Sequence, residues 1–220
     1  MLRRLLLLLF PPKCIFCQNI LGKEETDLCH NCRISVQEYG TGKRNIQFIA
    51  KWTALWYYKG DIRDSIHRYK FYRCQSYSKA YGRFLAMHLL QSDLLKETDC
   101  LSWVPTSFLR RLRRGYDQSK EVALEVSKQL RIPLVRTLVK HRHTPPQSTM
   151  KGMAQRRANI LGAYHVPKKA NIQGKRILLI DDILTTGCTA TECAKTLRLA
   201  GAKEVNLAAL AAVSHDKTSR

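Results

Sequence analysis

Two neighbouring aspartates followed by a threonine-rich turn form the most informative segment of the chain. The segment reads ILLIDDILTTGCT and spans Ile177–Thr189. We expect its first four aliphatic residues to form a buried strand that ends at Asp181 and Asp182, with a helix beginning near Thr189. A helix start presents unpaired N–H groups and a positive dipole end, which bind phosphate, and adjacent carboxylates accept hydrogen bonds from a vicinal diol. The segment therefore fits a ribose 5-phosphate; the alternatives for the acids are simple capping or a divalent-cation site.

Four cysteines near the start of the chain have metal-ligand spacing. Cys14, Cys17, Cys29 and Cys32 form a C-x2-C-x11-C-x2-C array. Two such knuckles supply the four thiolates of a tetrahedral Zn²⁺ site, and a closed site of this kind is structural. Zinc would fold this segment of about 40 residues, and its removal should unfold the module selectively. The alternatives are two disulfides or incidental thiols.

The elements that must position these clusters alternate along the chain. Hydrophobic patterns predict strands at 51–58, 101–104, 134–139, 176–180 and 205–213, and helices at 76–90, 117–130 and 189–200. We expect a turn around Gly40 and Gly42, a helix capped by Asp61, and a long mobile loop over 144–159. The alternation predicts an α/β fold with a doubly wound, mostly parallel sheet. A zinc-binding module at 1–42, with a short N-terminal helix, would precede the α/β domain at 43–220.

Charge is the most unusual property of the composition. The 220 residues include 38 Lys+Arg and 17 Asp+Glu, a net charge of +21, which predicts polyanionic partners. A hydrophobic share of 45% excludes disorder throughout. The apolar run Leu5–Phe10 is too short for the roughly 20 residues of a membrane span, so we expect a short amphipathic or buried segment there and leave membrane contact open. The four cysteines outside the array show no pairing pattern, which indicates a reducing cytoplasm.

Much of the excess charge lies in one stretch. Residues 103–157 hold 13 Lys/Arg and 3 acidic residues, a net +10. Within this stretch, Pro-Thr-Ser follows a strand and arginines follow at once, and N–H, hydroxyl and guanidinium groups all suit pyrophosphate. The candidate pyrophosphate-binding residues are Pro105, Thr106, Ser107, Arg113 and Arg114. For any single arginine, a solvated surface position is the alternative.

The motifs together resemble one family. FPPKCIFC, the second C-x2-C pair, VPTS, RRGYDQS, HTPPQSTM, RRANILGAY and ILLIDDILTTGCT are similar to those of ComF-type competence proteins, which join a zinc finger to a type I phosphoribosyltransferase domain. The chain departs from the family at Tyr116–Asp117, where Phe–Asn is frequent, and at Cys188, where Ala or Ser is frequent. The resemblance implies that Asp181 and Asp182 bind the ribose hydroxyls of 5-phosphoribosyl-1-pyrophosphate (PRPP). It implies that the 5-phosphate is wrapped by Thr185, Thr186, Gly187, Cys188 and Thr189.

The same resemblance implies pentosyl transfer assisted by Mg²⁺. The catalytic set is expected to be Asp181 and Asp182 with Arg156 and Arg157, the arginines lying on the 144–159 loop, which would close as a lid. Residues 51–91 are expected to bind the acceptor base or amine. The family association places the protein in natural transformation, with single-stranded DNA and the competence helicase and recombination machinery as partners, in the cytoplasm or at the inner face of the membrane.

Two other functions stay open. The chain could be a non-catalytic module that holds single-stranded DNA by phosphate contacts and stacking, although core packing is the favoured role of its clustered aromatics. Those aromatics are Trp52, Trp56, Tyr57, Tyr58 and Tyr72. The other alternative is a PRPP-responsive regulator without catalysis.

Overall fold

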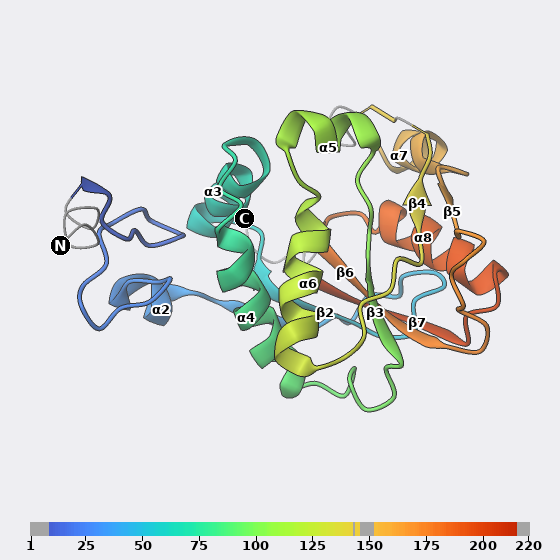
Figure 1. Cartoon of the computed structure of the whole chain (residues 1–220), viewed down its shortest axis with the longest axis horizontal. Helices are drawn as coiled ribbons and strands as arrows, with labels where there is room; N and C mark the ends of the chain where they lie inside the picture. The colour runs from blue at the N-terminus through green and yellow to red at the C-terminus, as the bar shows by residue number, and fades with distance from the viewer. Residues whose placement is uncertain (1–8, 143, 146–151, 215–220) are drawn as a thin grey trace.

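A five-stranded sheet forms the centre of the protein, which we describe from a computed structural model covering residues 9–142, 144–145 and 152–214 (Figure 1). The strand order is β1-β2-β7-β6-β3. β1 pairs antiparallel with β2 and every other pairing is parallel, which confirms the predicted mostly parallel sheet. The strands are β1 (Glu38–Thr41), β2 (Trp52–Tyr57), β3 (Cys100–Trp103), β6 (Arg176–Leu184) and β7 (Glu204–Ala212), and a separate antiparallel pair consists of β4 (Val139–Lys140) and β5 (Tyr164–His165).

Helices cover both faces of this sheet. Figure 1 shows α4 and α6 side by side over one face, whereas α8 packs on the other. The helices are α2 (His30–Ser35), α3 (Gly60–Phe71), α4 (Tyr77–Leu90), α5 (Phe108–Arg114), α6 (Gln118–Leu130), α7 (Met153–Ile160) and α8 (Cys188–Leu199). None of the helices in the described residues has the length and apolar character needed to cross a membrane. The expected N-terminal helix falls on residues 1–8, which lie outside the described residues.

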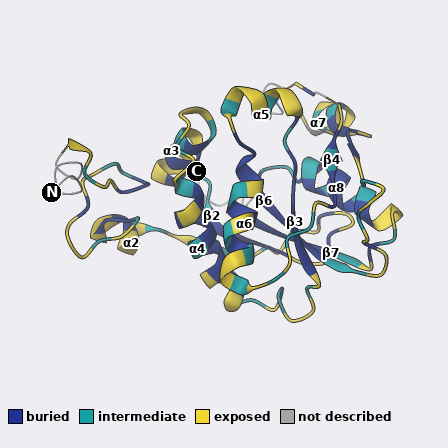
Figure 2. Cartoon of the chain, viewed as in Figure 1, coloured by how far each residue is buried: buried dark blue, intermediate teal, exposed yellow. Residues whose placement is uncertain are grey.

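Side chains of the central strands point alternately to the two faces of the sheet, and each face has its own hydrophobic core. Leu178 and Ile180 of β6 belong to the core beneath α3, α4 and α6, whereas Ile177 and Leu179 belong to the core beneath α8. Successive side chains of a strand point to opposite faces, so a strand buried on both faces is apolar at every position. Figure 2 shows these strands buried along most of their length.

Three expected elements differ in the structure. The strand expected at 134–139 is reduced to β4, because Leu134 makes only a single bridge to Leu101 of β3. The turn expected around Gly40 is the short edge strand β1. Asp61 does not cap α3; the helix begins at Gly60, and Asp61 lies in its first turn.

Three helices, α2, α5 and α7, arise where no helix was predicted. α7 occupies the second half of the expected loop, and residues 146–151 of that loop lie outside the described residues. α5 (FLRRLRR) buries none of its residues, so no buried apolar face marks it in the sequence.

Candidate functional site

The strand carrying the paired aspartates does not end at them. β6 continues to Leu184, and Asp181 pairs in register with Ala209 of β7. The prediction that the strand ends at the acids is therefore wrong. Because neighbouring residues in a strand point to opposite faces, the two carboxylates diverge, and the Asp182 N–H donates to Asp181 Oδ1 at 2.8 Å. Each carboxylate thus has its own surroundings.

Asp181 is the buried member of the pair. It is 8% exposed, and the Ser119 hydroxyl at the start of α6 donates to its Oδ1 at 3.2 Å. Burial, and then the negative charge of Asp182, raises the pKa of Asp181 to about 8. At neutral pH the protonated form is favoured, so this carboxyl group can both donate and accept a hydrogen bond.

Asp182 faces two cations. Its Oδ2 lies 2.8 Å from Lys70 Nζ of α3, with both side chains mostly buried. Burial lowers the pKa of Arg114 on α5, and the attraction of Asp182 opposes that shift. The guanidinium of Arg114 itself donates to Gln118 Oε1 at 2.8 Å and lies over the Phe71 ring, so Arg114 is near Asp182 and the described residues show no direct contact between the two. The structure adds Lys70, which the sequence did not single out because nothing distinguishes it among 38 cations.

The turn after β6 has the form expected of a phosphate loop. Gly187 is the N-cap of α8 and has φ +82°, a left-handed conformation that glycine adopts without strain. The N-cap makes no side-chain hydrogen bond and no acidic residue lies in the first turn, which is the form of a helix start that binds anions. Asp181 and residues 183–190 line a cavity of about 20 Å³, room for one water, so a phosphate would rest at its mouth.

This loop is tied to the segment that connects β1 and β2. The Arg44 guanidinium donates to the Thr185 carbonyl at 2.6 Å and lies over the Trp52 ring, 5.4 Å from its centroid. Within the loop, the Thr186 hydroxyl donates to Cys188 Sγ at 3.2 Å. Arg44 precedes β2 by several residues, and no local sequence pattern marked it. The contact holds the loop backbone in place.

The predicted pyrophosphate residues have mixed surroundings. Pro105, Thr106 and Ser107 connect β3 to α5, but the Thr106 N–H already donates to Asp117 Oδ2 at 3.1 Å. Asp117 also accepts from Lys120 N as the N-cap of α6, and burial raises its pKa to about 6. Arg113 is exposed, and within the described residues no contact joins it to either aspartate. Arg114 is the predicted arginine whose charge interacts with Asp182, and the pyrophosphate role of these residues stays a prediction.

The two arginines of the expected lid lie on α7. This helix packs beside α8, and the Gly162 N–H that follows it donates to Glu192 Oε1 at 2.7 Å. Arg156 is half-buried and Arg157 is exposed. The structure shows no contact from either arginine to Asp181 or Asp182 in the part of the chain it describes. Their catalytic role stays a prediction.

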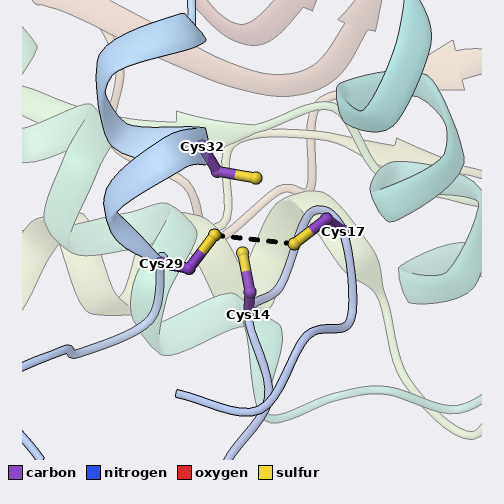
Figure 3. Close-up of side chains that lie close together, drawn as sticks. All are labelled: Cys14, Cys17, Cys29 and Cys32. Atoms are coloured by element: carbon purple, nitrogen blue, oxygen red, sulfur yellow. Dashed lines mark hydrogen bonds between the residues drawn. The ribbon is translucent and has the colours of Figure 1, made fainter. Parts of the chain in front are cut away.

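The four cysteines of the array converge on one point (Figure 3). Their Sγ atoms all lie within 4.8 Å of one another, and the thiols of Cys17 and Cys29 are 3.6 Å apart. All four are free cysteines, which excludes the disulfide alternative in this structure. Four thiolates at this spacing are the donor set of a structural Zn²⁺ site with no open position.

The cysteine module is packed into the rest of the protein. The Phe16 ring meets Trp56 edge to face, with 5.0 Å between centroids, and the Phe16 and Ile15 carbonyls accept from Arg68 of α3. Gln18 donates to the Tyr77 hydroxyl of α4 at 2.9 Å. The module and the helices therefore share one hydrophobic core.

Comparison with known proteins accounts for the combination of an α/β domain with a four-cysteine module. A phosphoribosyl transferase domain family matches residues 117–220, and a double zinc ribbon domain family matches residues 5–43. Competence protein F of Haemophilus influenzae is 26% identical over 90% of this chain and 96% of its own length. The chain belongs to the ComF-type family. Its fold is the type I phosphoribosyltransferase fold with a four-cysteine zinc module at the N-terminus.

Other relatives of this ComF-type chain match shorter regions. DNA utilization protein YhgH of Escherichia coli O157:H7 is 29% identical over 64% of this chain and 63% of that protein. The glutamine PRPP amidotransferase of B. subtilis, solved with ADP and GMP, is 25% identical over 62% of this chain and 26% of its own, with a TM-score of 0.43. The fold assignment rests on the family matches and the strand order. The boundary expected between residues 42 and 43 stays a prediction, and β1, just before it, already belongs to the central sheet.

Proposed function

We propose that this protein binds PRPP together with Mg²⁺ at the Asp181–Thr189 segment and is a phosphoribosyltransferase. The observation that carries the proposal is the arrangement at the end of β6. The strand runs through the acidic pair, a left-handed Gly187 begins α8, and Lys70 pairs with Asp182. The helix start would receive the 5-phosphate. The acidic pair would bind the ribose hydroxyls.

The residues present fit a magnesium ion bound with its substrate. Mg²⁺ retains several waters and takes phosphate oxygens of the substrate, so one or two carboxylates suffice from the protein. Asp182 is the partly accessible carboxylate of the pair and would supply that ligand. When bound, the ion would neutralise charge on the pyrophosphate, and Arg114 would add to that neutralisation from the protein side.

A calorimetric titration tests this proposal. PRPP is added to the full chain with and without Mg²⁺, and then a panel of nucleobases and amines is added to the complex. We expect binding that depends on Mg²⁺ and release of pyrophosphate with one acceptor. Absence of binding under both conditions would refute the proposed function, and binding without turnover would favour a PRPP-responsive regulator.

The lid arginines provide a separate prediction. Replacing Arg156 and Arg157 by alanine should weaken PRPP binding or slow turnover by about tenfold or more, since charge-assisted contacts to phosphate are worth about 1.5–3 kcal/mol each. The control is the exposed pair Lys168→Ala with Lys169→Ala, which removes the same charge outside the site. Equal PRPP titrations for the two double variants would remove the lid assignment.

We also propose a role in natural transformation, in the cytoplasm, with single-stranded DNA and the competence helicase and recombination machinery as partners. The relatives' names, Competence protein F and DNA utilization protein, support this role. On this chain, α5 buries none of its residues, carries four arginines, and exposes Phe108, Leu109 and Leu112. Trp52 and Trp56 are both 3% exposed and belong to the core, which is the role favoured from the sequence, so they offer no stacking surface to DNA.

If α5 binds DNA, removing one of its arginines should change both the affinity for single-stranded DNA and the salt dependence of that affinity. Arg113→Ala should weaken binding of a single-stranded oligonucleotide and reduce the slope of log affinity against log salt by up to about one. Arg198→Ala, on the exposed end of α8, is the matched control. Fluorescence anisotropy at several salt concentrations measures both quantities. Identical slopes for the wild type and both variants would exclude α5 as the DNA surface.

A further inference from the structure

Two histidines face each other on the outer side of the small ribbon formed by β4 and β5. His141 directly follows β4, and His165 is the last residue of β5. Their Nδ1 atoms are 3.3 Å apart, and their rings are tilted by 51° with 5.2 Å between centroids. Neither residue belongs to the phosphate loop, the acidic pair or the cysteine array, so the sites described above give this pair no role.

The register of the ribbon places both histidine side chains on one face. Lys140 of β4 pairs with Tyr164 of β5. The His141 N–H continues the ladder by donating to the Ala163 carbonyl at 3.1 Å. Residues two apart on a strand point to the same side, so His141 and His165 are diagonal neighbours across the ribbon. Both are exposed, whereas Lys140 and Tyr164 on the opposite face are buried.

No carboxylate pairs with either imidazole in the described part of the chain. The residues that share their face of the ribbon, Val139 and Ala163, are apolar. The polar contact of the two side chains is the one between their own Nδ1 atoms. Two ring nitrogens that face each other at this distance can share a proton, or they can share a metal ion.

The separation of the two nitrogens matches a zinc ion bound by both. Zn–N bonds are about 2.0–2.1 Å long, and with such bonds a separation of 3.3 Å corresponds to an N–Zn–N angle of about 104–111°. This range includes the tetrahedral angle that zinc adopts in proteins. Neutral imidazole is the commonest metal ligand, and with the ring proton on Nε2 the Nδ1 lone pair is available to the ion.

The backbone around the pair is fixed by further contacts. Arg142, next to His141, donates to the carbonyls of Asn159 and Leu161 at 3.1 and 2.8 Å. These contacts join the end of β4 to the end of α7 and hold the His141 backbone beside β5. A pair of ligands that is in place before the ion arrives loses less conformational entropy on binding.

We propose that His141 and His165 form a second zinc site, with Nδ1 of each ring as a ligand and water completing the coordination. Two protein ligands leave positions open to water, so zinc at this site exchanges, unlike zinc in the closed four-cysteine site. The ion would link the two strands of a ribbon that has only two residues in each strand, and would thereby stabilise it. This site does not depend on PRPP binding.

Calorimetric titration of Zn²⁺ into the full chain tests the proposal. The protein is first dialysed into metal-free buffer, which leaves the cysteine site loaded because four thiolates bind zinc far more tightly than two imidazoles. A further zinc ion should then bind to each chain. His141→Ala and His165→Ala should each weaken this binding about tenfold or more, whereas His67→Ala, at another exposed histidine, should leave it unchanged.

Nitrogen NMR of protein with labelled histidines gives a readout specific to the two rings. Zinc should shift the Nδ1 resonances of His141 and His165 and leave those of His67 in place. Both side chains are exposed, so without added zinc their alanine variants should melt like the wild type, and zinc should raise the melting temperature of the wild type but of neither variant. The proposal is overturned if no zinc binds beyond the cysteine site, if both single variants keep wild-type affinity, or if zinc shifts Nε2 rather than Nδ1.

Discussion

Asp181→Asn is expected to weaken PRPP binding by at least tenfold and, at the same time, to raise the melting temperature of the protein. The carboxyl group is buried, has Ser119 as a hydroxyl donor, and lies beside a second acid. Its pKa is about 8, so ionisation in the folded state is unfavourable at pH values where the unfolded chain ionises freely. An amide of nearly the same shape removes that cost, but it cannot ionise and its NH₂ group replaces one of the two carboxyl oxygens that could accept from a ribose hydroxyl.

The stability effect has a defined pH dependence. The folded pKa of Asp181, about 8, lies above the unfolded value of about 3.9. Its stabilising contribution is therefore fully present below about pH 4 and is lost as pH rises through about 8. The gap in melting temperature between Asp181→Asn and the wild type should grow over this window. A gain of about 1 kcal/mol would appear as roughly 2–4 °C.

Asp182→Asn is the matched control. It should also weaken PRPP binding, but it should lower the melting temperature, because it leaves the mostly buried Lys70 ammonium without its carboxylate. Calorimetry with PRPP and Mg²⁺ and thermal melts from pH 4 to pH 9 distinguish the two variants. Stability changes of the same sign in both variants, or PRPP binding equal to wild type, would contradict the assignment of the pair.

The sequence predicted the parts of this site that are local. The Ile177–Thr189 segment does form a strand, a left-handed glycine turn and a helix start, because apolar strand residues and a glycine before a helix specify these structures by themselves. The cysteine array converged for the same reason, since its spacing alone sets the geometry.

The parts that depend on distant packing could not be predicted. Lys70 and Arg44 reach the site from α3 and from the segment before β2, and nothing in their neighbourhoods marks them. The continuation of β6 through its aspartates is set by pairing with β7, whose small alanines allow both strands to run on together. Tertiary contacts therefore decided where the acids point, although the sequence had identified which acids to examine.

Removal of zinc is expected to have the largest effect on stability. Binding of a structural Zn²⁺ supplies about 10–16 kcal/mol in small zinc modules, as much as the whole stability of a typical domain. From the sequence alone, only the N-terminal module should unfold. In the structure, however, Cys14 and Phe16 lie in the same core as Trp56 and Tyr81, and Arg68 donates to carbonyls of the module. Loss of the metal should therefore also loosen α3 and α4.

We accordingly expect Cys14→Ser with Cys32→Ser to lower the melting temperature of the whole chain by more than about 10 °C, given that about 1 kcal/mol corresponds to 2–4 °C. Cys74→Ser, at a half-buried cysteine outside the array, is the control and should melt like the wild type. Metal analysis should find one zinc per wild-type chain. Hydrogen exchange should show faster exchange at residues 13–35 and in α3 in the double variant. Faster exchange confined to residues 13–35 would mean that the module unfolds on its own. A wild-type protein without zinc would refute the metal site, because packing alone would then have to hold the four thiols together.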